Sequence, residues 1–318
     1  MDWTRILSGD PGGLVPLRQR IDTLFTQQRA TWPMLRDGEA ALTALRRKPL
    51  ELDGESILVQ YNPARRQSTT AKTDAQSVAA RPCFLCPQNM PAEERGMTFE
   101  DLVVMPNPFP VLPMHCTIAA NEHTPQRLAA GRIGQFLRLT KAIGPDLAAL
   151  YNGPRCGASA PDHFHFQAAL ANEIPLLKQL PDHGPGQSIT AHSSFGRQML
   201  VLESADAAAL ENLLAAAIRE LGSPDAAADE PLLNLIGHYD GHRYHVIVFP
   251  RAAHRPACFF ATGGDQLTVS PAVLEMGGVL VTTVPEHFDR VVAEIARGIY
   301  DEVSAPAKVV EQIAARLA

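Results

Sequence analysis

The residues with the clearest capacity for chemistry lie in one short stretch, residues 157–167, which ends in His-x-His-x-Gln. If this part is a strand, alternate side chains share a face, so His163, His165 and Gln167 point one way while Phe164 and Phe166 point into a core. The small residues and proline before the histidines are typical of a loop that brings backbone close to a ligand. Two imidazoles and an amide on one face indicate a polar task; the alternative is a half-exposed strand with surface histidines.

A histidine on such a strand is suited to attack phosphorus. Neutral imidazole is a good nucleophile near pH 7, because its unperturbed pKa is about 6.5. Attack would form a covalent phosphoramidate, which splits one displacement into two easier steps. We expect His165 to be the nucleophile and Gln167 to donate its amide to phosphate oxygens, with Ser159 and the backbone of Gly157 completing the cradle. His163 would support the nucleophile while it is held by a metal.

A Cys-x-x-Cys pair, Cys83 and Cys86, lies on a proline-flanked segment upstream. This spacing is typical of a metal knuckle, and zinc needs four ligands, so two more are required. His163 and His123 are the candidates that would complete a closed, structural Cys2His2 zinc site, with His115 as the rival to His123. A redox pair and two small buried residues are the competing interpretations.

Two basic groups could bind anions. Arg65, Arg66 and Lys72 follow a predicted strand, and guanidinium groups match phosphate oxygens. In the second half of the chain, three residues after another strand could bind phosphate or an acceptor, and these are Arg251, His254 and Arg255. The alternative for each group is a solvated loop or turn. A further histidine cluster consists of His238, His242 and His245, for which a metal is less favoured than a hairpin with incidental histidines.

Composition bounds the class of protein. The chain has 318 residues with 46% hydrophobic and 19% charged residues, which is typical of a globular protein. Its net charge of −6 argues against nucleic acid as a partner. Five cysteines, one close pair and no signal-peptide core favour a reducing compartment over a disulfide framework. No apolar run is long enough to span a membrane, so we expect a cytoplasmic protein.

Hydrophobic periodicity places these residues on elements. Helices are predicted over residues 14–45, divided by Pro33, and from Thr124-Pro125 to about residue 143, with a second short helix over 145–151. Strands are predicted over residues 56–61, 102–105 and 115–120, and a Gly/Pro-rich stretch at 181–186 is the candidate boundary. The second half is predicted to have strands at 197–202, 232–236 and 243–250, and helices at 206–221, 286–303 and 307–317.

The histidine stretch resembles the histidine-triad superfamily in its transferase branch. Galactose-1-phosphate uridylyltransferases carry Gly-x-Ser-x-Pro-His-Pro-His-x-Gln, which is similar to residues 157–167. In that family the second histidine takes the nucleotidyl group, the first binds zinc and the glutamine holds phosphate. The resemblance implies these roles for His165, His163 and Gln167. It also implies that Asn152 lies near the nucleophile, and that the zinc ligands are Cys83, Cys86, His123 and His163.

Other segments resemble phosphorylases of the same branch. GDP-hexose phosphorylases carry Asn-His-Leu-His-Phe-Gln-Ala, similar to residues 162–168, and Asn-Pro-Ala-x-x-Glu-x-x-Gly, similar to residues 270–278. Dinucleoside tetraphosphate phosphorylases carry a pattern similar to residues 107–115, and a bacterial family of unknown function shares the Arg-Pro-Cys-Phe-Leu-Cys segment. Phe164 departs from the proline of the uridylyltransferases. Gln167, where small histidine-triad hydrolases have a third histidine, favours transfer over hydrolysis.

The resemblance implies an α+β fold of two tandem histidine-triad-like halves, residues 1–180 and 181–318, with mainly antiparallel sheets and flanking helices. It implies a ping-pong nucleotidyltransferase that cleaves a nucleoside diphosphate-sugar, GDP-hexose-like, with phosphate. The alternatives are a dinucleoside tetraphosphate phosphorylase and a zinc-stabilised nucleotide-binding protein without turnover. The expected partners are a nucleotide or nucleotide-sugar and phosphate, and the chain would act as a monomer or a homodimer.

Overall fold

The computed structural model describes residues 1–10, 15–129, 131–180, 186–222 and 230–318. The strands are β1 (Arg46–Leu52), β2 (Glu55–Tyr61), β3 (Met97–Phe99), β4 (Leu102–Pro106), β5 (Cys116–Ala120), β6 (Leu147–Asn152), β7 (His165–Leu170), β8 (Ser188–Ser194), β9 (Arg197–Ser204), β10 (Leu233–Tyr239), β11 (Tyr244–Pro250) and β12 (Val279–Thr282). The α-helices are α1 (Leu17–Thr31), α2 (Pro33–Thr43), α3 (Arg66–Thr69), α4 (Ala75–Ala79), α5 (Arg132–Ile143), α6 (Ala207–Leu221), α7 (Ala257–Phe260), α8 (Val273–Met276), α9 (Pro285–Arg290), α10 (Ala293–Val303) and α11 (Ala307–Leu317). Short 3-10 helices are η1 (Pro63–Arg65), η2 (Pro87–Asn89), η3 (Ala171–Glu173), η4 (Pro175–Lys178) and η5 (Gly263–Asp265).

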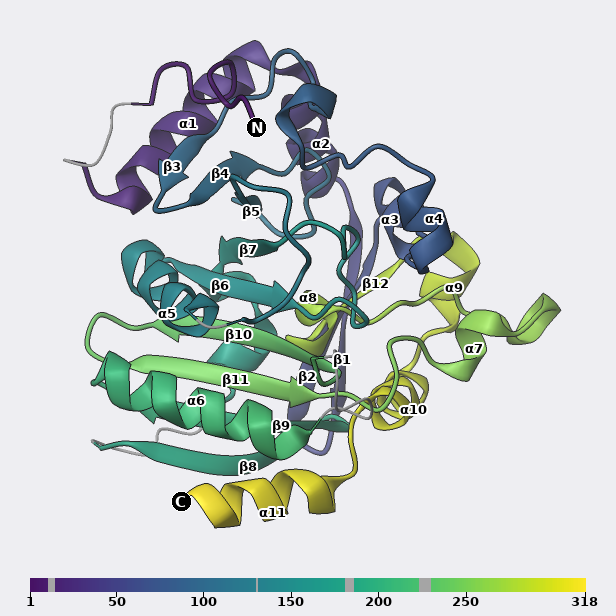
Figure 1. The fold of residues 1–318 in the computed structure, drawn as a ribbon. Coiled ribbons are helices and arrows are strands. Elements are labelled where there is room, and N and C mark those ends of the chain that lie inside the picture. The colour runs from purple at the N-terminus through teal and green to yellow at the C-terminus, as the bar shows by residue number, and fades with distance from the viewer. Residues whose placement is uncertain (11–14, 130, 181–185, 223–229) are drawn as a thin grey trace.

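One large antiparallel sheet organises the described part of the chain. Its nine strands run in the order β3-β4-β5-β7-β6-β10-β11-β9-β8, from the top to the bottom of Figure 1. The strands before and after residue 180 meet at its centre, where β6 pairs with β10 and Asn152 lies opposite Asn234. The predicted α+β class with mainly antiparallel strands is confirmed. The division into halves stays a prediction, and most of the stretch at 181–186 lies outside the described residues.

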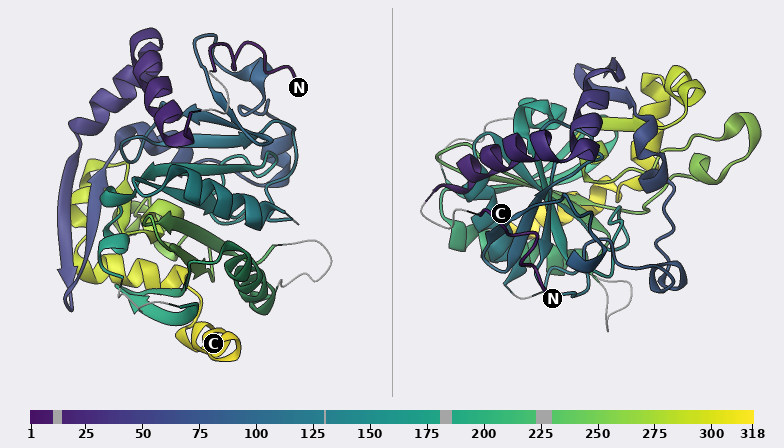
Figure 2. Two further views of the ribbon diagram at one scale, coloured as in Figure 1. Left: turned by 90° about the vertical axis from the view of Figure 1, so that its left-hand side faces the viewer. Right: turned by 90° about the horizontal axis from the view of Figure 1, so that it is seen from above.

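Both faces of the large sheet are covered. One face packs against helices that include α5 and α6, with a core that contains Phe136, Phe166 and Leu210. The other face packs against the smaller sheet β1-β2-β12 and the C-terminal helices near it, with a core that contains Val59 and Val281. Figure 2 shows the two layers on either side of the large sheet. In the small sheet, β12 from the C-terminal part runs parallel to β2 from the N-terminal part, so the two parts of the chain also pair there.

The predicted short helix at residues 145–151 is wrong. Residues Leu147–Asn152 form β6, a central strand between β7 and β10 in which all six residues are buried. A strand that is covered on both faces has no polar alternation, and its alanines and leucines also suit a helix, so periodicity could not separate the two. The strand matters for the site because it ends at Asn152, beside the histidine strand.

The predicted helix start at Thr124-Pro125 is also wrong. Helix α5 begins at Arg132, after Gly131 with φ 84°. The preceding residues instead form a strap over the histidine strand: the carbonyl of Thr124 accepts from the Phe164 N–H at 2.6 Å. The buried side chain of Gln126 accepts from the backbone N–H of His165 at 2.7 Å and donates to its carbonyl at 2.9 Å. The strap therefore fixes the backbone of His165.

Candidate active site

The histidine strand β7 lies between β5 and β6 in the large sheet, and the side chains of His165 to Gln167 alternate between its two faces as predicted. Phe164 and Phe166 are buried in the helix-side core, with their ring centroids 4.9 Å apart. His165 and Gln167 face the opposite way and line a cleft. The aromatic face anchors the strand, and the polar face is therefore held in place for chemistry.

The imidazole of His165 is oriented by its own backbone. Its Nδ1 atom lies 2.9 Å from the carbonyl oxygen of His163. Because a carbonyl only accepts, Nδ1 carries the proton and donates it, which leaves the lone pair on Nε2. Burial lowers the pKa of His165 to about 4, so the ring is neutral near pH 7. A neutral ring with a free Nε2 is the form that a nucleophilic histidine needs.

Gln167 is oriented by His115. The backbone N–H of Val111 donates to Nδ1 of His115 at 3.2 Å, so the proton of the neutral ring is on Nε2. That atom lies 3.3 Å from Oε1 of Gln167 and donates to it. Burial lowers the pKa of His115 to about 3, which keeps this donor pattern fixed. The carbonyl end of Gln167 is thereby engaged, and its two amide N–H groups are left to donate to a ligand.

Two adjoining cavities meet at the polar face of the histidine strand. The larger encloses about 630 Å³ and contains His165, and the smaller encloses about 50 Å³ and contains His115. Four residues line both: Arg65, Ser68, Ser159 and Gln167. The larger volume is in the range of small-molecule sites. A ligand in one cavity can therefore contact groups that also face the other.

The small cavity contains the predicted cradle. Gly157 has φ 98°, and a Cβ atom there would lie 2.5 Å from Cβ of Ala272, so only glycine fits. The Oδ1 atom of Asn152 accepts from Asn234 Nδ2 and from the Val273 N–H, both at 2.8 Å. Its Nδ2 group is therefore free of these contacts in a residue that lines the cavity. The resemblance placed Asn152 near the nucleophile, and the structure puts it in the adjoining cavity.

The predicted basic residues divide into two groups. Arg65 lines both cavities, Lys72 lines the larger, and Arg255 and His254 line the smaller. Arg66, by contrast, is exposed and lines neither. Arg251 also lines neither cavity, and all its N–H groups donate within the chain, to oxygens of Val303, Asn234, Pro271, Ala253 and His254. Arg251 therefore holds loops together and is not placed to bind phosphate.

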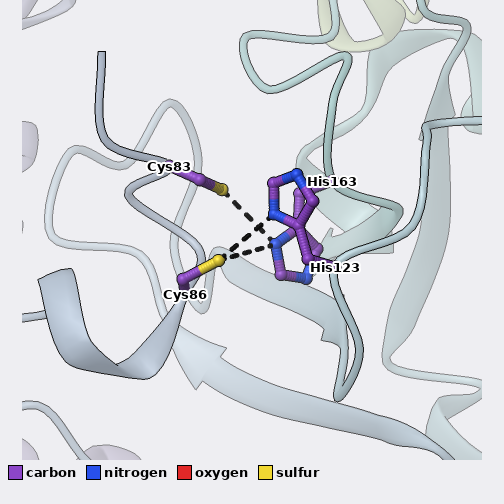
Figure 3. A group of neighbouring side chains, drawn as sticks. All are labelled: Cys83, Cys86, His123 and His163. Carbon is purple, nitrogen blue, oxygen red and sulfur yellow. Dashed lines mark hydrogen bonds between the residues drawn. The ribbon is translucent and has the colours of Figure 1, made fainter. Parts of the chain in front are cut away.

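The cysteine pair and two histidines converge in space (Figure 3). Ligand atoms of Cys83, Cys86, His123 and His163 all lie within 4.8 Å of one another, and this group could hold a metal ion. Sγ of Cys83 is 3.4 Å from Nδ1 of His163, and Sγ of Cys86 is 3.2 Å from Nδ1 of His123. His115 lies instead against Gln167, so it is not a member of this group.

The ring of His163 is oriented by a backbone acceptor on the side away from the sulfurs. Nε2 of His163 lies 2.8 Å from the carbonyl of Ala120 and donates to it, so the Nδ1 lone pair faces the sulfurs. Nε2 of His123 lies 3.7 Å from a carboxylate oxygen of Asp162. Two thiolates and two imidazoles are a donor set that suits tetrahedral zinc, and an acceptor hydrogen-bonded to the far nitrogen, as Ala120 is to His163, is typical of metal-binding histidines.

The second histidine cluster lies on the β10–β11 hairpin, away from both cavities. His245 is placed between Glu203 at 2.8 Å and Asp240 at 3.0 Å, and His238 donates to the carbonyl of Pro145 at 2.8 Å. The backbone N–H of His242 donates to Asp240 in the turn. Hydrogen bonds within the hairpin and to its neighbours therefore account for these three histidines.

The cleft also contains residues that the sequence did not single out. Phe84 and Phe109 are large apolar residues that are 45% and 46% exposed and line the larger cavity with Glu94 and Arg81. Phe84 lies between the two cysteines, and Phe109 lies in the proline-rich segment before His115. Their positions inside two recognised motifs were the available signal. No sequence pattern indicated Glu94, because its burial depends on the folded chain.

One protein family and two solved structures are similar to this chain. Residues 24–170 match the family model described as a domain of unknown function, DUF4922. The structure is similar to that of yeast Ap4A phosphorylase Apa2 in complex with Ap4A, with a TM-score of 0.59 at 15% identity over 91% of this chain and 97% of that chain. The complex of the same protein with AMP gives a TM-score of 0.58 at 15% identity over 92% and 97%. This shared fold fits the branch that the sequence resemblance indicated.

No curated protein matches the chain by sequence. Within the described residues, every helix is too short or too polar to cross a membrane.

Proposed function

We propose that this chain is a nucleotidyltransferase that cleaves a nucleoside diphosphate-sugar with phosphate, through a nucleotide bound covalently to His165. The observation that carries the proposal is the contact of Nδ1 of His165 with the carbonyl of His163, which leaves Nε2 unprotonated beside Gln167. The shared fold with a phosphorylase supports the reaction class.

The reaction proceeds in two balanced displacements. Nε2 of His165 attacks the α-phosphorus, the P–N bond forms, and the bond to the bridging oxygen breaks, so the sugar leaves as its 1-phosphate. Inorganic phosphate then attacks the same phosphorus, the P–N bond breaks, and a nucleoside diphosphate leaves. His165 returns to its neutral state, so one histidine serves both steps.

The surrounding donors stabilise charge on the transferred phosphoryl group. The amide of Gln167 is aimed by His115, and the guanidinium of Arg65 uses one N–H for the carbonyl of Phe109 at 2.9 Å. Its other N–H groups make no hydrogen bond with described residues and are available to phosphate oxygens. The small cavity, with Arg255 and His254, is the proposed place for the second phosphate group. Exposed Lys72 at the rim attracts the anionic substrate.

The metal in this proposal is a structural zinc ion. Cys83, Cys86, His123 and His163 would hold it, and it would supply a staple between the cysteine segment and the histidine strand. His163 and His165 are two residues apart, so the staple would also fix the carbonyl that orients the nucleophile.

Two other functions remain in competition. A dinucleoside tetraphosphate phosphorylase would use the same histidine and phosphate, and the fold shared with yeast Ap4A phosphorylase supports it. A zinc-stabilised nucleotide-binding protein without turnover would use the same cleft, but the free Nε2 of His165 favours an enzyme.

The test is a substrate screen with inorganic phosphate. Purified full-length chain is mixed with GDP-, ADP- and UDP-hexoses and with dinucleoside tetraphosphates, and nucleoside diphosphate release is measured. Release from a sugar nucleotide, lost in His165→Asn, is the expected result. Turnover of the tetraphosphates alone would favour the first alternative, and nucleotide binding without release would favour the second.

A further inference from the structure

Glu94 is a buried acidic residue that lines the large cleft, as His165 does. The residue is only 9% exposed. Among the described residues, its carboxylate accepts no hydrogen bond and forms no ion pair, although the charge of Arg5 acts on it. A carboxylate that is buried without donors is costly, because its hydration is lost and nothing replaces it. A group of this kind at the wall of a cleft indicates a ligand that supplies the donors.

The position of Glu94 is fixed by its backbone rather than by its side chain. The guanidinium of Arg5 donates to a series of carbonyls in the loop that carries Glu94, at Pro87, Met90, Pro91, Ala92 and Glu94 itself. The side chain of Gln28 in α1 donates to the carbonyl of Glu93 at 3.1 Å and accepts from the N–H of Arg95 at 2.8 Å. Hydrogen bonds on both sides of Glu94 therefore hold the backbone of this loop in place at the wall of the cleft.

The same cleft offers flat apolar surfaces. Phe84 and Phe109 line it and remain nearly half-exposed, and the buried indole of Trp32 lines it as well. Aromatic side chains are the usual stacking partners of nucleobases, and they accept every base because each has a π-face. The aromatic residues therefore explain why a base would enter the cleft but not which base.

Glu94 supplies the discrimination. A carboxylate has only acceptors, so it pairs best with two adjacent donors. The pairing edge of guanine has two neighbouring donors, the N1–H and the exocyclic amino group. The edges of adenine and cytosine each combine one amino donor with a ring acceptor, and the single N–H of uracil is flanked by two carbonyls.

We propose that Glu94 determines the base specificity of this site and recognises guanine by a bidentate hydrogen bond to its N1–H and amino group. This inference rests on the proposed function and adds to it the residue that recognises the base; guanine is the base that the resemblance to GDP-hexose phosphorylases implied. Binding replaces the donors that Glu94 lost on burial, so the ligand removes the cost of the unpaired carboxylate. Adenine at this place would leave its N1 lone pair against a carboxylate oxygen.

The experiment compares four diphosphates that differ only in the base. Calorimetric affinities of the full-length chain for GDP, IDP, ADP and UDP are measured for the wild type, for Glu94→Gln and for Glu93→Gln. Glu93→Gln is the matched control, because Glu93 is the exposed neighbour on the same loop. Because a charged hydrogen bond contributes on the order of ten- to a hundredfold in affinity, we expect GDP to bind tighter than ADP by that factor. IDP, which lacks the amino group, should lie between them.

The variants separate recognition from folding. Glu94→Gln should lose on the order of tenfold or more in GDP affinity while its ADP affinity stays near that of the wild type, and Glu93→Gln should change neither. Retained ADP binding shows that the variant is folded. Equal wild-type affinities for GDP and ADP, or an unchanged GDP preference in Glu94→Gln, would overturn the guanine assignment and leave the proposed transfer reaction standing. If no diphosphate binds, both proposals are wrong.

Discussion

Nε2 of His115 lies 3.3 Å from Oε1 of Gln167, and the backbone N–H of Val111 occupies the other nitrogen of the His115 ring. The two contacts leave one arrangement of protons, in which His115 donates and Gln167 accepts. An amide could otherwise present either its oxygen or its nitrogen to a ligand. The histidine that the sequence offered as a rival zinc ligand therefore sets the direction of the proposed phosphate donor.

Replacement of His115 by phenylalanine should slow the chemical step. The amide of Gln167 would lose its fixed direction, so we expect kcat to fall on the order of tenfold, with little change in nucleotide affinity. His115→Gln keeps a donor near the Nε2 position and should recover part of the loss. Steady-state kinetics with parallel binding measurements check this. An unchanged kcat in His115→Phe would show that Gln167 needs no positioning.

Substitution of Arg65 should weaken nucleotide binding far more than substitution of its neighbour Arg66. Arg65 lines both cavities, whereas Arg66 is exposed and lines neither. Arg65→Ala should weaken binding of a nucleoside diphosphate by on the order of tenfold or more, because a charged hydrogen bond to phosphate is lost. Arg66→Ala serves as the matched control and should change affinity by less than about twofold, as expected for a solvated charge. Equal effects of the two substitutions would contradict the placement of Arg65.

Metal removal should destabilise the chain. Cys83→Ser removes one of four converging ligands, so we expect loss of bound zinc and a lower melting temperature. Cys258→Ser is the control, because this cysteine lies in α7 and is not part of the group. Elemental analysis and thermal unfolding are the measurements. About one zinc per wild-type chain is expected, and a zinc-free wild type with an unchanged melting temperature after chelation would refute the metal site.

Guanine nucleotide binding should strengthen as the pH rises from 6 to 8. Burial raises the pKa of Glu94 to about 7, while the charge of Arg5 opposes the shift. Below that pH the carboxyl group is protonated and cannot accept two hydrogen bonds, and above it the carboxylate is available. The phosphate groups of the nucleotide titrate in the same range, so Glu94→Gln is measured in parallel. The difference between wild type and variant should grow with pH, and a constant difference would contradict the role of Glu94.

Short-range sequence patterns predicted most residues of the candidate site. The alternation of the histidine strand and the Cys-x-x-Cys spacing are local, and the residues that they indicated lie where the polar face and the metal group are found. The basic residues were harder, because composition cannot distinguish an arginine that faces a cavity from one that is engaged with carbonyls. Arg251 is such a case, since Val303, Asn234 and Pro271 among its partners come from other segments of the chain.

The features that the sequence did not predict, such as strand β6 and the burial of Glu94, also depend on distant parts of the chain. Strand β6 consists of helix-forming residues that are buried only because β7 and β10 flank them. Glu94 looks like any surface glutamate in the sequence. The loop that carries it is held by hydrogen bonds from Arg5 and Gln28, which lie far upstream in the chain. Such features arise from tertiary packing and leave no local pattern.

The covalent intermediate is the central claim, and intact-mass spectrometry tests it directly. The full-length chain is incubated with a GDP-hexose in the absence of phosphate and then with phosphate. We predict a mass increase of one guanylyl group on the wild type, labile in acid as a phosphoramidate is, absent in His165→Asn and discharged as GDP when phosphate is added. GDP release that proceeds in His165→Asn, or turnover by the wild type in which no adduct ever forms, would contradict the account.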